Sequence, residues 1–96
     1  MIKTKIFIDG DLLRPSEDFH RQFARQLGIS KYYGANLSAL RDTLFGGVEC
    51  PCLLIWKGHK NSKGNMGDDY YKILAVLESV HSNFLRFSEG FDFALE

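Results

Sequence analysis

Cys50 and Cys52 are the first side chains to consider for chemistry, because two nearby thiolates can bind a metal ion or exchange a disulfide. His59 follows seven residues later, whereas His20 and His81 lie far away along the chain. A structural zinc site needs four ligands, and a redox pair usually has two residues between its cysteines. The pattern therefore favours reduced, partly buried thiols at the start of a strand, with no bound metal. A small thiol or metal enzyme built on Cys50, Cys52 and His59 is the alternative.

Other catalytic patterns are incomplete. Gly58 and Gly64 have five residues between them and Asn65 after them, whereas a phosphate-binding P-loop has four and then Lys and Ser or Thr. No serine occupies a strand–turn–helix elbow. We therefore expect a protein that is not an enzyme and needs no cofactor, and we expect residues 58–67 to form a flexible loop.

A binding surface is the more promising feature. Tyr and Arg are enriched in the energetic centres of protein interfaces, and glycine allows close backbone approach. Residues of these types gather between positions 32 and 45, where we find Tyr32, Tyr33, Gly34, Asn36, Arg41, Asp42 and Phe45. The alternative is structural, with Tyr33 and Leu37 in the core and Gly34 in a turn.

These residues need elements that position them. Apolar spacing predicts a helix over Ser16–Leu27 and a short helix with Leu37, Leu40 and Leu44 on one side, capped by Asn36 and ended by Gly46 and Gly47. Strands are expected at residues 2–8, 52–56 and 91–95, the second of them buried on both faces. A last helix is expected from residue 68 to about residue 88, with Gly90 as its cap. A competing interpretation breaks this helix near Asn83 and pairs residues 84–87 with 91–95 in a hairpin.

The alternation of strands and helices predicts an α/β fold with a small three-stranded parallel sheet and three to four packed helices, mainly on one face. The length of 96 residues fits one domain over residues 1–96. Twelve basic and twelve acidic residues give zero net charge, which argues against a broad nucleic-acid-binding face. No apolar run is long enough to span a membrane and no secretory signal is recognisable, so we expect a cytoplasmic protein.

The central segment Tyr32-Tyr33-Gly34-Ala35-Asn36-Leu37-Ser38-Ala39-Leu40-Arg41-Asp42 resembles the Tyr-Tyr-Gly-x-Asn-Leu-x-Ala-Leu-x-Asp signature of the barstar family. Val48-Glu49, the following proline and the run Leu53-Leu54-Ile55-Trp56 resemble its second strand. The resemblance covers nearly the whole chain and is specific in residues 32–56. It implies a three-stranded parallel sheet covered by helices, and a protein that inhibits barnase-type ribonucleases.

The resemblance also implies a binding mechanism. Asp42 stands at the position of the aspartate that enters the cationic cleft of the ribonuclease in place of a phosphate. Tyr32, Gly34 and Asn36 match the loop that covers that cleft. The chain departs from barstar itself at Ala35, Ser38 and Arg41, where two acids and a tryptophan are replaced.

The predicted partner-binding set therefore combines the surface residues and the resemblance: Tyr32, Tyr33, Gly34, Asn36, Ser38, Arg41, Asp42, Phe45, Gly46, and Glu78 or Ser79. The partner implied is an extracellular or toxin-type ribonuclease bound by a monomer, with no direct contact to nucleic acid or membrane. Because acids are lost and Arg41 is gained, an immunity or adaptor protein for a partner that is not a ribonuclease is the alternative.

Overall fold

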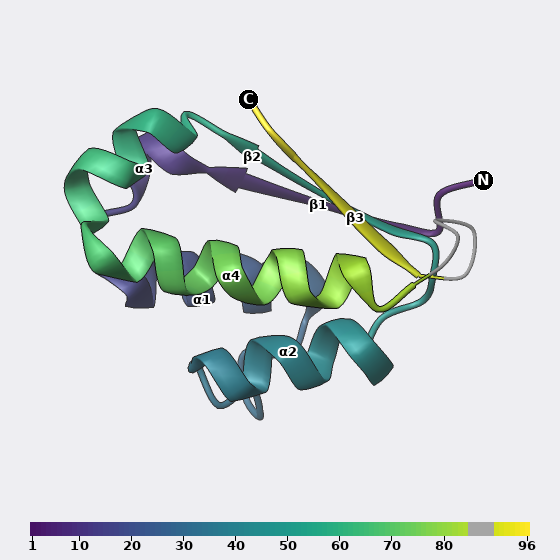
Figure 1. Ribbon diagram of the computed structural model, residues 1–96. Helices are drawn as coiled ribbons and strands as arrows, with labels where there is room; N and C mark the ends of the chain where they lie inside the picture. Colours follow the sequence, from purple (N-terminus) through teal and green to yellow (C-terminus); the bar gives the residue numbers. More distant parts are fainter. Residues whose placement is uncertain (85–89) are drawn as a thin grey trace.

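The computed structural model describes residues 1–84 and 90–96 (Figure 1). The elements follow in the order β1 (Thr4–Asp9), the 3-10 turn η1 (Gly10–Leu12), α1 (Ser16–Leu27), α2 (Leu37–Gly46), β2 (Cys52–Lys57), α3 (His59–Met66), α4 (Asp68–Ser82) and β3 (Phe91–Leu95).

The three strands form one parallel sheet in the order β1-β2-β3. Ile6 pairs with Leu54, which pairs in turn with Phe93, so that apolar side chains from all three strands share one face. The chain moves the same way along the sheet in both crossovers, and crossovers of one hand then place their helices on one face. Figure 1 shows α1 and α4 covering that face, and α2 lying on the far side of α4 from the sheet. The predicted α/β class and parallel sheet are confirmed.

The opposite face of the sheet has no helix over it among the described residues (Figure 1). Lys5 and Phe7 are exposed there, and Leu53 and Ile55 are half-buried. The prediction that the second strand is buried on both faces is therefore wrong. The side chains of its nearly continuous apolar run are fully buried on one face of the sheet and half-buried on the other.

Two glutamines of α1 cover the free edge of β1. The backbone N–H of Phe7 donates to Gln26 Oε1 at 2.6 Å, and the Gln26 amide donates back to the Phe7 carbonyl. Gln22 makes the same pair of bonds with Asp9, at 2.7 and 3.1 Å. Glutamines four apart on a helix match strand residues two apart, because both spacings advance about 6–7 Å.

Residues 59–66 form helix α3, which corrects the predicted loop over residues 58–67. The helix holds because tertiary contacts outweigh its poor intrinsic propensity. Ser62 is fully buried and accepts a hydrogen bond from Trp56 Nε1 at 3.0 Å. Its hydroxyl donates to the Gly10 carbonyl at 2.9 Å. These bonds join α3 to β2 and η1.

Helix α4 ends at Ser82, which corrects the predicted end near residue 88 and removes Gly90 as its cap. The Asn83 amide donates to the Ser79 carbonyl at 2.7 Å, and the break near Asn83 in the competing interpretation is confirmed. Residues 85–89 of its hairpin lie outside the described residues. Phe84 continues the apolar spacing beyond the helix and packs against Phe45 of α2, with ring centroids 5.9 Å apart.

Candidate functional site

The loop before α2 and the first turn of that helix depend on the backbone conformations and contacts of Gly34, Ala35 and Asn36. Asn36 is the N-cap, and its Oδ1 accepts a hydrogen bond from the Ala39 N–H at 2.8 Å, as predicted. Ala35 adopts φ 53°, a left-handed conformation that is unusual for a residue with a Cβ. A Cβ at Gly34 would lie 3.3 Å from the Ala39 Cβ, so the glycine lets the loop lie close to the helix.

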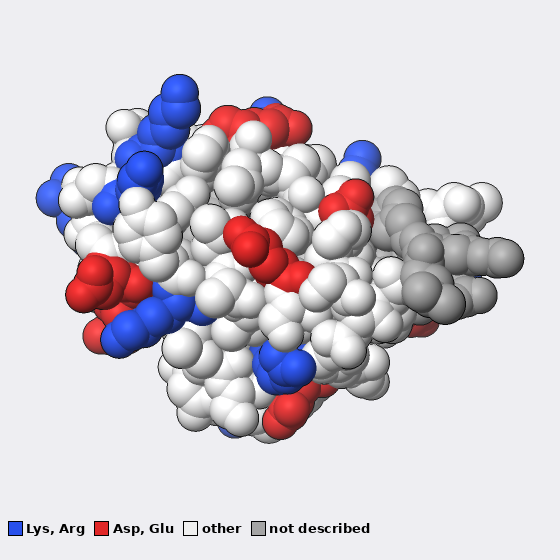
Figure 2. Space-filling view, viewed as in Figure 1, with Lys and Arg blue, Asp and Glu red and all other residues white. Residues whose placement is uncertain are grey.

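Helix α2 divides into a buried and an exposed side. Leu40 and Leu44 are fully buried, whereas Ser38, Asp42 and Phe45 are exposed at the i, i+4, i+7 spacing of a single stripe. Figure 2 shows basic and acidic side chains interspersed on the face that carries α4 and α2, with no broad area of either sign. This face therefore offers a partner no extended acidic or basic patch.

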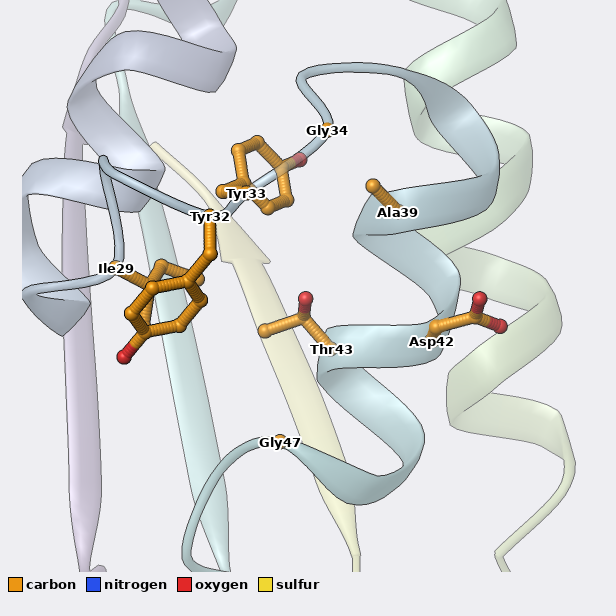
Figure 3. A pocket seen from close by; sticks show the side chains of 8 residues that line it. All are labelled: Ile29, Tyr32, Tyr33, Gly34, Ala39, Asp42, Thr43 and Gly47. Carbon is orange, nitrogen blue, oxygen red and sulfur yellow. The ribbon is translucent and has the colours of Figure 1, made fainter.

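An open cavity of about 360 Å³ lies between the loop and α2. Its walls include Tyr32, a residue that is 78 % exposed, and the edge of α2 at Asp42. Figure 3 shows Thr43 pointing from α2 towards the tyrosines, while the Asp42 carboxylate points out on the other side of the helix. The lining residues absent from the predicted set are Ile29, Ala39, Thr43 and Gly47. The four-residue spacing of small residues at 39, 43 and 47 is the sequence signal that could have found them.

Tyr33 turns inward rather than towards the surface. Its hydroxyl lies 2.6 Å from Nδ1 of the buried His20, and its ring lies 5.4 Å from the Phe23 ring. Burial lowers the pKa of His20 below 6.5 and raises the pKa of Tyr33, so both groups are neutral near pH 7. Tyr33 thus fits the structural alternative and anchors the loop that exposes Tyr32.

Arg41 lies on the flank of α2 that faces α4. Its Nη1 donates to Ser79 Oγ at 2.7 Å, and its guanidinium carbon lies 5.2 Å from the centroid of the Phe45 ring. Ser79 is therefore occupied by a contact within the protein, and the adjacent Glu78 is exposed. Gly46, the last residue of α2, is exposed and has open space where a Cβ would stand.

The structure does not bring the thiols and His59 together. Cys50 precedes β2 and His59 follows it, so the strand separates them by roughly 20 Å. His59 Nδ1 is 2.9 Å from the Tyr70 hydroxyl, and burial together with the charge of Cys50 raises the pKa of Cys52 to about 12. A thiol of this kind is protonated and unreactive at neutral pH. The geometry gives no support to the thiol or metal enzyme.

Residues 1–84 and 90–96 contain no cluster of three or more His, Cys, Asp or Glu side chains able to hold a metal ion. In the same residues, no helix combines the length and the apolar character needed to cross a membrane.

Comparison with known proteins places these features in a family. Residues 4–96 match the family model described as "Barstar (barnase inhibitor)". The chain is also similar to a Bacillus subtilis (strain 168) protein named "Putative ribonuclease inhibitor YrdF", with 36 % identity over 76 residues. That alignment covers 79 % of this chain and 84 % of the relative. The capped α2, the tyrosine loop before it and the parallel sheet beneath are thus those of a barstar family protein, and the chain belongs to that family.

Proposed function

We propose that this chain is an inhibitor that blocks the active site of a barnase-type ribonuclease, with Asp42 as the anchoring carboxylate. The observation that carries the proposal is the exposed Asp42 on the capped helix α2, beside the open cavity and the exposed Tyr32. Family membership and the name of the Bacillus subtilis relative support a ribonuclease as the partner class. We place this activity in the cytoplasm, carried out by a monomer against a toxin-type ribonuclease.

The mechanism follows from the chemistry of a ribonuclease cleft, which binds RNA phosphates with cationic side chains. A carboxylate inserted there replaces a phosphate oxygen and accepts charge-assisted hydrogen bonds from Arg or Lys. Tyr32 and Gly34 line the open cavity together with Asp42, and water is excluded around the ion pair once the ribonuclease covers this surface. Such bonds strengthen when water is removed, because the local dielectric constant falls.

The zero net charge of the chain affects how its association rate with a ribonuclease depends on salt. A strongly acidic inhibitor is steered over long distances towards a basic enzyme, and that steering is screened by salt. This chain has no such excess charge, so its association rate with a basic ribonuclease depends weakly on ionic strength. Affinity then rests on contacts in the bound state, chiefly those of Asp42.

The test is a titration of a purified barnase-type ribonuclease with this protein and with its Asp42→Ala variant. We expect stoichiometric inhibition by the parent chain and a loss of about 2–5 kcal/mol of binding free energy in the variant, the usual range for a buried charge-paired anchor. Calorimetry gives the affinity directly. A loss below about 0.5 kcal/mol would reject Asp42 as the anchor.

The matched control is Glu96→Gln, which also removes one negative charge. Glu96 is exposed at the chain end marked C in Figure 1, on the opposite side of the molecule from α2. We expect this variant to inhibit as the parent does. If both variants lose affinity equally, general charge rather than the Asp42 contact is responsible.

A partner other than a ribonuclease is the second candidate, and Arg41 on the same helix is the observation that favours it. Affinity capture from the source cell, with Asp42→Ala as the negative bait, separates the two. A nuclease retained only by the parent chain supports the inhibitor, and a different partner retained in the same way supports the second candidate.

A further inference from the structure

Arg41 is held in one position on the surface that carries Asp42. Its guanidinium donates to Ser79 Oγ at 2.7 Å and rests on the Phe45 ring, with 5.2 Å from Cζ to the centroid. Phe45 is supported in turn by Phe84, 5.9 Å away between centroids. An arginine fixed by such contacts has already lost much of the side-chain entropy that a free arginine loses on binding.

The charge of Arg41 is not neutralised by a carboxylate within the described part of the chain. The ion pair found there joins Arg21 to Asp18, and the other close contact between groups of these types places His81 Nδ1 3.4 Å from Asp92 Oδ1. Ser79 is a neutral acceptor and uses one of the five N–H donors of the guanidinium. Asp42 is the next residue, but it stands about 100° further round the helix, and it forms no ion pair with Arg41 within the described residues.

We infer that Arg41 is a specificity-determining residue and that the partner presents a carboxylate to it, next to the cationic group that meets Asp42. The inference rests on the proposed function and adds the charge pattern of the partner. Arg41 and Asp42 are the charged residues of α2, so the helix presents one positive and one negative group side by side. A ribonuclease whose cleft rim is uniformly cationic would meet Arg41 with like charge, which disfavours the wrong partner.

The experiment measures dissociation constants against a purified barnase-type ribonuclease with a basic cleft rim. We expect Arg41→Ala to bind about threefold more tightly than the parent chain and Arg41→Glu at least tenfold more tightly, as a repulsion is removed and then reversed. Each basic residue of the rim is then changed to Glu in turn. One such change should tighten binding of the parent at least fivefold and weaken binding of Arg41→Glu by a similar factor.

Two controls separate this role from simpler ones. Lys60→Glu makes the same change of net charge on the exposed side of α3, far from α2 (Figure 1), and should leave both affinities within twofold. Ser79→Ala keeps the charge of Arg41 but removes its fixing hydrogen bond, and should shift affinity less than Arg41→Glu does. If Arg41 only joined α2 to α4, its substitution would weaken binding to every ribonuclease variant with the same sign.

The inference is overturned if the parent chain and Arg41→Glu respond alike across the whole rim series. In that case the parent still inhibits, and the proposed function stands without it. If neither the parent nor any variant reduces ribonuclease activity, the proposed function fails and the inference fails with it.

Discussion

The two ends of this molecule differ in how tightly their side chains are packed. At the end where α3 meets η1, Ser62 and Trp56 are fully buried, and the hydroxyl of Ser62 bonds to both Trp56 and Gly10. At the end formed by α2 and its preceding loop, Tyr32 and Asp42 are exposed beside an open cavity. We call the first the closed end, because Ser62 and Trp56 are packed without space around them. We call the second the open end, because Tyr32 and Asp42 are accessible to a partner.

This difference separates stability from recognition. A change at the closed end must move backbone or leave a buried polar group unpaired, and both cost free energy of unfolding. A change on the exposed stripe of α2 touches neither the sheet nor the fully buried leucines of that helix. We therefore expect substitutions at the closed end to change the free energy of unfolding, and substitutions at the open end to change the affinity for a partner.

Gly10→Ala should give the largest loss of stability. A Cβ at this position would lie 2.4 Å from the Lys57 carbonyl oxygen and 2.5 Å from Ser62 Oγ. We expect the free energy of unfolding in urea to fall by about 3 kcal/mol, the upper part of the usual range for overpacking. Gly64→Ala is the control, because its Cβ would meet nothing within 4 Å and alanine favours the helix by about 0.5–1 kcal/mol. Equal effects of the two substitutions would contradict the closed-end description.

Ser62→Ala should cost about 2 kcal/mol, because Trp56 Nε1 and the Gly10 carbonyl both lose their partner in a buried place. The control is Ser38→Ala on the exposed stripe of α2, where we expect a change within about 0.5 kcal/mol. Chemical unfolding followed by Trp56 fluorescence measures both variants. The contrast between the ends is lost if Ser62→Ala is as mild as Ser38→Ala.

His20 provides the smallest effect, a pH dependence at the base of the open end. Burial holds its folded-state pKa below the unfolded value of 6.5, so between these two values the unfolded chain binds more protons. The free energy of unfolding should therefore fall as pH is lowered from 7.5 through 6.5, and level off below the folded-state pKa. His20→Gln should show a shallower fall over the same range. Identical pH profiles for the two proteins would show that His20 is not the titrating group.

The structure of the open end could be predicted from the sequence more completely than that of the closed end. The loop, the Asn36 cap and the exposed stripe are local features, and each is written in consecutive or helically spaced residues. Helix α3 is not, because Gly64 and the asparagines of this segment disfavour a helix, and Ser62 holds it through a partner 52 residues away. The end of α4 is predicted too far along the chain, because Phe84 continues the apolar spacing of the helix although its ring packs on Phe45. The contact of Arg41 with Ser79 joins residues 38 apart, and no periodicity reveals it.

The glutamine pair on α1 also protects one edge of the sheet from strand addition by another copy of this chain. The hydrogen-bonding groups of Phe7 and Asp9, which a foreign strand would need in order to add to the sheet, are already taken by Gln26 and Gln22. A sheet edge of this kind does not template growth, whereas an uncovered edge invites ordered aggregation. The covered edge of β1 therefore lets copies of this chain meet at high concentration without pairing through that strand.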